Sequence, residues 1–163
     1  MTENKALGER VGEVLRSRGL TMGTAESCTG GRIANMITLV AGSSDYFVGG
    51  VVSYSNEVKQ NVLGVSEDSL RLHGAVSREV VEQMALGAIR TLGCDCSVAT
   101  SGVAGPGGGT PEKPVGTVWI AAALKDRVVS HCYHFGTVRA ENIQSAADTA
   151  LTMVLELLQK SNG

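Results

Sequence analysis

The order of strand-like and helix-like segments along this chain limits its fold more than any other feature. Short segments rich in apolar and β-branched residues alternate with longer segments whose apolar residues recur every three or four positions. This alternation is typical of an α/β fold in which helices cover a mainly parallel sheet. We therefore expect a three-layer α/β/α architecture with a mixed sheet of about five to six strands.

The individual elements follow from hydrophobic periodicity and from glycine and capping signals. Helices are predicted at residues 4–18, 29–41, 56–64, 77–92 and about 141–160. Strands are predicted at residues 20–26, 46–55, 94–102, 117–124 and 128–135. The last two strands are joined by a turn of three residues and should pair antiparallel, which makes the predicted sheet mixed.

Length and composition exclude several classes of protein. The 163 residues, 43% hydrophobic and 18% charged, favour one globular domain spanning 1–163. A net charge of -2 and an aromatic content of 4% argue against a nucleic-acid partner. The N-terminus carries regularly spaced charges, and no apolar run approaches the roughly 18 residues of a membrane span. We expect a cytoplasmic protein with reduced cysteines and no membrane partner, which forms a homo-oligomer.

Three loops that follow strands are the expected location of a functional site. They cover residues 26–31, 54–59 and 101–109. In open α/β sheets, ligands bind beyond the carboxyl ends of the strands, so these loops should converge on one site.

Ser27 lies where a strand passes into a helix, within the segment TAESCTGGR. The backbone N–H groups of Thr29, Gly30 and Gly31 at the helix start suit an oxyanion or a phosphate group. A simple helix-capping role is the alternative for this serine, and the segment lacks the G-x-S-x-G pattern of α/β-hydrolases. Cys28 is a rival nucleophile, although a free cysteine is often a plain core residue.

A serine nucleophile needs a base, and the histidines offer no obvious pairing with a carboxylate. Lys59 is the other option, because it lies on the helix that follows Tyr54 and should face the same strand-end surface. A desolvated lysine can be neutral near physiological pH and accept a proton. The alternative is that Lys59 is a solvated surface charge.

The glycine-rich loop GVAGPGGG and Arg139 are candidates for ligand binding. Glycine lets backbone amides approach an anion closely, but the loop lacks the phosphate-loop spacing G-x-x-x-x-G-K-[ST] and could be a flexible surface turn. Arg139 precedes the last helix, where its guanidinium could clamp a phosphate or carboxylate or simply lie on the surface. A metal site is not expected, because C-x-C and H-x-x-H lack zinc-finger spacing.

Five segments together resemble the CinA C-terminal domain family: AESCTGGR, GGVVSYSNEVKQNVLGV, HGAVSREVVEQMALG, VATSGVAGPGGGTPEKPVGTVWIA and FGTVRAENI. The similarity covers nearly the whole chain in the family's order and spacing. It implies hydrolysis of the carboxamide of nicotinamide mononucleotide to nicotinic acid mononucleotide and ammonia, a step of pyridine nucleotide salvage, with no metal or organic cofactor. The chain lacks the N-terminal domain of full-length CinA proteins, so we expect a stand-alone deamidase.

By position, the resemblance assigns the nucleophile to Ser27, and it carries the family's lysine to Lys59 and its tyrosine to Tyr54. We expect Lys59 to take the Ser27 proton and Tyr54 to be a catalytic residue that links to Lys59. Ser101 stands where the family usually has threonine, which keeps a hydroxyl and loses a methyl group. We expect backbone amides near Thr29, Gly30 and Gly31 to stabilise the oxyanion. The remaining candidates would bind the nucleotide substrate: Ser101, Gly105, Gly107, Gly108 and Arg139. A non-catalytic module that only binds nucleotides is the alternative.

Overall fold

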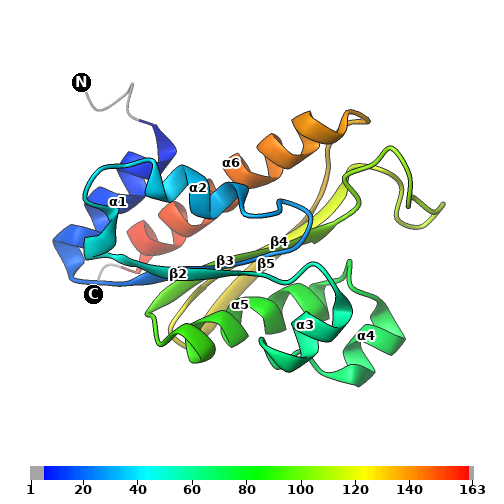
Figure 1. Ribbon diagram of the computed structural model, residues 1–163, viewed down its shortest axis with the longest axis horizontal. Helices are drawn as coiled ribbons and strands as arrows, with labels where there is room; N and C mark the ends of the chain where they lie inside the picture. The colour runs from blue at the N-terminus through cyan, green and yellow to red at the C-terminus, as the bar shows by residue number, and fades with distance from the viewer. Residues whose placement is uncertain (1–5, 162–163) are drawn as a thin grey trace.

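A computed structural model describes residues 6–161 as a five-stranded sheet with helices on both faces (Figure 1). The strands are β1 (Met22–Glu26), β2 (Phe47–Val52), β3 (Cys96–Gly102), β4 (Thr117–Leu124) and β5 (Arg127–His134). The helices are α1 (Leu7–Arg18), α2 (Arg32–Thr38), α3 (Asn56–Asn61), α4 (Glu67–His73), α5 (Arg78–Leu92) and α6 (Arg139–Lys160). A short 3₁₀ helix, η2 (Ser43–Asp45), precedes β2.

The sheet is mixed, with the strand order β2-β1-β3-β4-β5. β1 pairs in parallel with β2 and β3, whereas β4 is antiparallel to both β3 and β5. All the strands except β4 therefore run in one direction. This confirms the α/β prediction, including the late hairpin.

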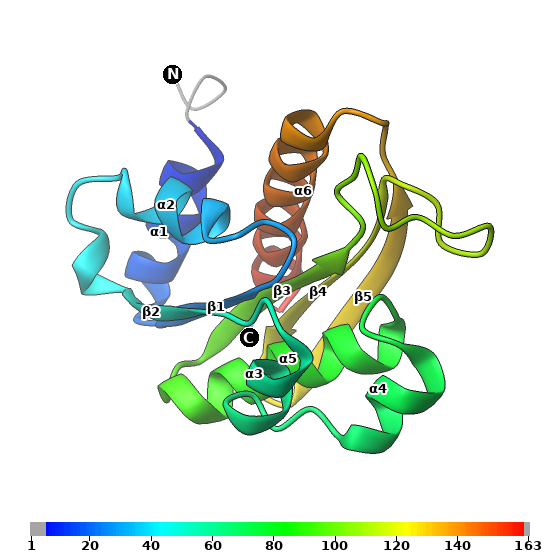
Figure 2. The ribbon, with the colours of Figure 1, turned by 45° about the vertical axis from the view of Figure 1, so that its right-hand side comes forward.

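Helices α1, α2 and α6 cover one face of the sheet, and α3, α4 and α5 lie on the other (Figures 1 and 2). The alternation of side chains along β4 produces these two faces, since successive residues of a strand point in opposite directions. Val118, Ile120 and Ala122 join the hydrophobic cluster that contains α6. Ala121 and Ala123 join the cluster that contains α5.

Several element boundaries differ from the sequence-based prediction by one to three residues, including the ends of β2, α2 and α3. The helix predicted from residue 29 begins at Arg32, because Gly30 and Gly31 have φ angles of 58° and 100° and form a left-handed turn. α6 begins at Arg139, two residues before the predicted start. α1 begins at Leu7, and residues 4–5 of its predicted range lie outside the described part of the chain.

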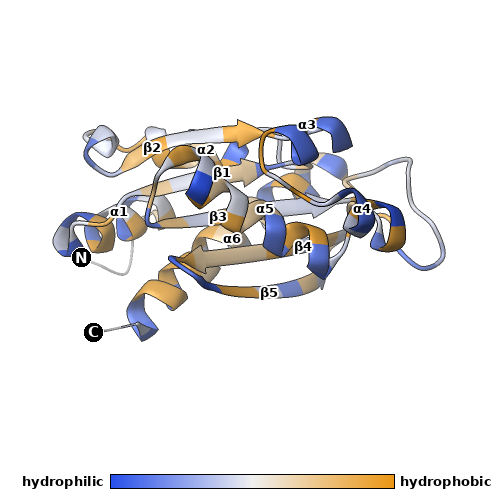
Figure 3. Ribbon diagram, turned by 90° about the horizontal axis from the view of Figure 1, so that it is seen from below, coloured by the Kyte–Doolittle hydropathy of each residue, from blue (hydrophilic) through white to orange (hydrophobic). Residues whose placement is uncertain are grey.

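Helix α4 was not predicted at all. None of its residues is buried, and Figure 3 shows that it is largely hydrophilic. A helix without a buried stripe has no hydrophobic periodicity, so the pattern that revealed the other helices is missing here.

The carboxyl ends of β1, β2 and β3 meet at one edge of the sheet, because these strands are parallel neighbours. The three loops singled out from the sequence leave the sheet at this edge. Within residues 6–161, no helix combines the length and apolar character that a membrane span requires.

Candidate active site

Ser27 and Lys59 form a buried pair at the carboxyl end of β1. The Lys59 Nζ lies 3.0 Å from the Ser27 Oγ. It also donates to the backbone carbonyls of Ser53 at 2.8 Å and Tyr54 at 3.3 Å. Only 1% of Lys59 and 8% of Ser27 is exposed, so Lys59 is not the solvated surface charge that the sequence also allowed.

Backbone pairing beyond the strand ends holds the two side chains in place. The Ser27 N–H donates to the carbonyl of Thr100 at 3.1 Å, and the Ser53 N–H donates to the carbonyl of Glu26 at 2.7 Å. α3 then begins at a serine cap, where Ser55 Oγ accepts the N–H of Val58 at 3.2 Å. The pair is therefore positioned by three strands and one capped helix.

Burial sets the charge states of the groups around Ser27. It lowers the pKa of Lys59, because the charged form loses its hydration. A negative charge on Cys28 would raise the Lys59 pKa, but burial raises the pKa of the Cys28 thiol itself to about 11. Cys28 is consequently a neutral thiol near pH 7, and the effect of burial on Lys59 prevails.

A cavity of about 310 Å³ opens beside this pair, a size found among small-molecule sites. It brings together most of the residues predicted for the site: Ser27, Tyr54, Lys59, Ser101, Gly105, Gly107, Gly108 and Arg139. Among residues 6–161, no acidic side chain lines this cavity. Ser101 is buried, and its hydroxyl has no hydrogen-bond partner within the described chain.

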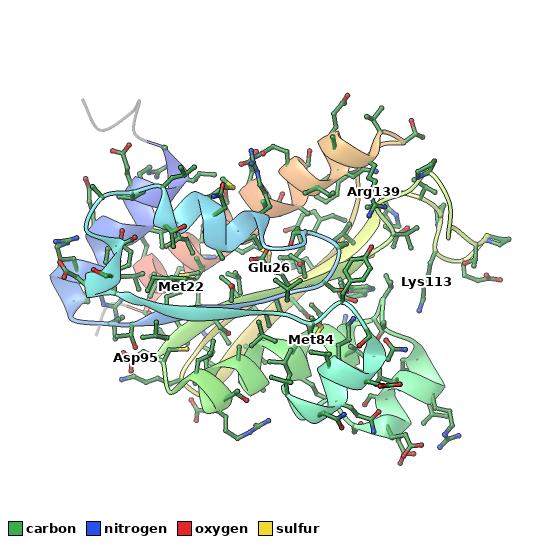
Figure 4. The ribbon with its side chains drawn as sticks, viewed as in Figure 1. Met22, Glu26, Met84, Asp95, Lys113 and Arg139 are labelled. Atoms are coloured by element: carbon green, nitrogen blue, oxygen red, sulfur yellow. The ribbon has the colours of Figure 1, made fainter. Side chains whose placement is uncertain are left out.

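Arg139 connects two of the loops around the cavity. Its Nη1 donates to the carbonyl of Gly105 at 2.7 Å, and its Nη2 donates to the Tyr54 hydroxyl at 3.3 Å. Figure 4 shows Arg139 at the base of the long glycine loop. Two donors of the guanidinium are used in this way, and the other N–H groups remain available for a ligand.

The structure argues against Gly30 and Gly31 as oxyanion donors. The Gly30 N–H donates to the carbonyl of Ser27 at 3.0 Å, and the Gly31 N–H donates to the Glu26 carboxylate at 3.2 Å. Neither these glycines nor Thr29 line the cavity. Among residues 6–161, the backbone N–H groups of Cys28 and Thr29 donate to no oxygen.

Sequence reasoning missed Asn142, which organises the far wall of the cavity. This residue is buried in the first turn of α6. Its amide nitrogen donates to the carbonyls of Ala104 and Gly136, both at 3.0 Å, and its amide oxygen accepts the Gly136 N–H at 2.8 Å. Asn142 thus joins the glycine loop to the start of α6, and no local pattern in the sequence marks it.

No group of three His, Cys, Asp or Glu side chains within the described residues could hold a metal ion. Cys132 Sγ and His134 Nε2 are 3.9 Å apart on β5, but no third ligand joins them.

The model of the CinA C-terminal domain family matches residues 4–158. The chain belongs to this family. Its similarity to a CinA-like protein of Chloroherpeton thalassium is 47% identity over 164 residues, which cover 98% of this chain and 39% of that protein. The chain thus spans well under half the length of this CinA-like relative.

Two further proteins are similar to this chain over most of their own length. The nicotinamide-nucleotide amidohydrolase PncC of Escherichia coli is 54% identical over 122 residues, which cover 75% of this chain and 74% of that enzyme. The crystal structure of competence/damage inducible protein CihA from Agrobacterium tumefaciens has a TM-score of 0.90 and 42% identity, with 94% of this chain and 93% of that chain covered. The fold expected from the resemblance is confirmed.

Proposed function

We propose that this protein hydrolyses the carboxamide of nicotinamide mononucleotide to nicotinic acid mononucleotide and ammonia. The Ser27–Lys59 contact of 3.0 Å is the observation that carries the proposal. The name of the Escherichia coli relative, nicotinamide-nucleotide amidohydrolase, supports the choice of substrate.

The surroundings of the Lys59 Nζ suit a general base. Two of its three neighbours are carbonyl oxygens, which only accept hydrogen bonds. A neutral amine has two N–H groups for these carbonyls, and its lone pair is then left for the hydroxyl proton of Ser27. After proton transfer, the ammonium donates to the same three oxygens. The proton can therefore move without a rearrangement of Lys59.

In the proposed reaction, Ser27 Oγ attacks the carboxamide carbon while Lys59 takes the hydroxyl proton. The N–H group of Cys28, which lines the cavity and donates to no oxygen of the described chain, stabilises the oxyanion of the tetrahedral intermediate. Lys59 returns its proton to the leaving nitrogen, and the C–N bond breaks to give ammonia and an acyl-enzyme. A water molecule attacks the acyl group as Lys59 accepts its proton, and this proton restores the hydroxyl of Ser27.

We assign the nucleotide's phosphate and ribose to the Arg139 side of the cavity. The guanidinium has N–H groups to spare, and the absence of acidic lining residues favours an anionic ligand. Gly105, Gly107 and Gly108 let the backbone approach the ligand closely. The Ser101 hydroxyl, which has no partner in the described chain, is available for a hydrogen bond to the substrate.

The test is ammonia release from nicotinamide mononucleotide, nicotinamide riboside, nicotinamide and the intact dinucleotide. We expect the mononucleotide to rank first and Ser27→Ala to abolish the release. Ser17→Ala, which removes a hydroxyl from the exposed side of α1, is the matched control. Saturable binding of the mononucleotide without turnover by the wild-type protein would contradict the proposal and favour a nucleotide-binding module.

A further inference from the structure

Glu26, the residue before Ser27, is a buried carboxylate that the proposed reaction does not use. Only 1% of it is exposed. Figure 4 shows it in the interior, between the sheet and the start of α2. Neither the composition nor the periodicity of the sequence indicated a role for this residue.

Four donors surround the Glu26 carboxylate, and all belong to the segment that follows it. Its Oε1 accepts the Thr29 hydroxyl at 2.6 Å, the Gly31 N–H at 3.2 Å and the Ile33 N–H at 2.9 Å. Its Oε2 accepts the Ala34 N–H at 2.9 Å. The side chain therefore folds forward and caps α2 from inside, where Gly31 at the N-cap has no side chain to do so.

Glu26 fixes both ends of the turn that carries Ser27, one through its backbone carbonyl and the other through its carboxylate. On one side, the Glu26 carbonyl accepts the N–H and the hydroxyl of Ser53 at 2.7 and 3.2 Å. On the other side, the Glu26 carboxylate holds the start of α2. The backbone from residue 27 to residue 31 is thus closed into a short loop between two fixed points.

Two hydroxyl groups, those of Thr29 and Thr100, link the same carboxylate to β3 by hydrogen bonds. Thr29 has one hydroxyl proton, and it donates this proton to the Glu26 Oε1. The 2.9 Å contact between the Thr29 and Thr100 hydroxyls is then donated by Thr100. The Thr100 carbonyl in turn accepts the Ser27 N–H, so the network returns to the nucleophile.

We infer that Glu26 is a positioning residue for Ser27. Its carboxylate holds the 27–31 turn so that the Ser27 Oγ stays in contact with Lys59, and so that the Cys28 N–H, which donates to no oxygen of the described chain, stays directed at the cavity. It also occupies the N–H groups of Gly31, Ile33 and Ala34 at the start of α2. This inference rests on the proposed function, in which Ser27 is the nucleophile.

The test compares Glu26→Ala, Glu26→Gln and the control Glu67→Ala, which removes an exposed carboxylate from the first turn of α4. Displacement of a reacting group by about 1 Å costs about a hundredfold in rate. We expect Glu26→Ala to lower kcat about a hundredfold. Its KM should stay within threefold of the wild-type KM, because the substitution does not alter Arg139 or the glycine loop. Glu26→Gln keeps an oxygen acceptor for the Thr29 hydroxyl, and its kcat should be at least tenfold higher than that of Glu26→Ala.

A second readout separates this inference from the substrate assignment. Sulfonylation of Ser27 by phenylmethylsulfonyl fluoride, followed by mass spectrometry, measures the reactivity of the nucleophile without any nucleotide. We expect the rate to fall in the order wild type, Glu26→Gln, Glu26→Ala, even if nicotinamide mononucleotide proves not to be the substrate. Equal sulfonylation rates in the three proteins, or a lower melting temperature with unchanged kcat, would overturn the inference.

If Glu26→Ala does not fold, Thr29→Val carries the test with Glu26→Gln. This variant removes the hydroxyl that donates to Glu26 and nearly preserves the shape of the side chain. We expect Thr29→Val to slow the sulfonylation of Ser27 at least threefold relative to the wild type. A wild-type rate in both variants would contradict the inference.

Discussion

The dependence of activity on pH tests the role of Lys59 in detail. An ordinary lysine, with a pKa of about 10.4, is neutral in about one molecule in 800 at pH 7.5. Burial lowers the pKa of Lys59, and each unit of lowering raises the neutral fraction about tenfold while the ammonium still predominates. Because the base must be neutral, kcat/KM should rise tenfold per pH unit on the acid side and become constant at a lower pH than it would with an ordinary lysine as the base.

Lys59→Met measures the contribution of the amine to the rate. Methionine has a similar length and an apolar stem, but it cannot accept a proton near pH 7. A general base contributes about 10²- to 10⁴-fold to the rate, which corresponds to about 3 to 5 kcal/mol of the activation barrier. We expect kcat to fall by that factor and the pH dependence to disappear. Lys160→Met, at the exposed end of α6, is the matched control.

Ammonia release from nicotinamide mononucleotide, followed from pH 5 to pH 10, provides the assay. Two results would refute the reasoning about Lys59. One is a rate that still rises about sevenfold between pH 9 and pH 10, as expected for a solvated lysine with a pKa of about 10.4. The other is a folded Lys59→Met protein that keeps its activity and the wild-type pH profile.

Three further variants test other parts of the site and the fold. Arg139→Gln should raise KM for nicotinamide mononucleotide about 10- to 150-fold, since a hydrogen bond to a charged group is worth about 1.5 to 3 kcal/mol. KM for nicotinamide riboside, which has no phosphate, should change much less. An equal rise in KM for the two substrates would contradict the phosphate assignment. Cys28→Ala should retain activity, because the thiol is neutral near pH 7. Loss of activity in a folded Cys28→Ala protein would instead favour Cys28 as the nucleophile. Gly87→Ala should lower the melting temperature by about 2 to 12 °C, because the added Cβ would overlap the carbonyl oxygen of Leu63 and overpacking costs about 1 to 3 kcal/mol. Gly107→Ala should melt like the wild type, because in the described chain no atom beyond its sequence neighbours lies within 4 Å of the added Cβ.

The sequence was sufficient to predict the sheet and the convergence of three loops at one of its edges. Each strand has an apolar segment of its own, and parallel strands necessarily bring their carboxyl ends together. The loops that carry Ser27, Lys59 and Ser101 were therefore expected to converge, and they line one cavity in the structure.

The polar contacts inside the site could not be predicted in the same way. Glu26 precedes a serine in an apparently polar turn, and only the three-dimensional path of the chain turns its carboxylate back onto α2. The same contact occupies the Gly31 amide, which the local pattern presented as free. Asn142 binds backbone groups of residues 104 and 136, so its role depends on long-range contacts that periodicity does not contain.

The most direct test of the central claim is to identify the residue that carries the acyl group in the acyl-enzyme. Wild-type protein mixed with nicotinamide mononucleotide should be quenched in acid within one turnover, digested, and sequenced by tandem mass spectrometry. We predict an acyl group derived from the nucleotide on Ser27, and none in the Ser27→Ala protein. An acyl group on Cys28, or steady ammonia release by Ser27→Ala, would contradict the account.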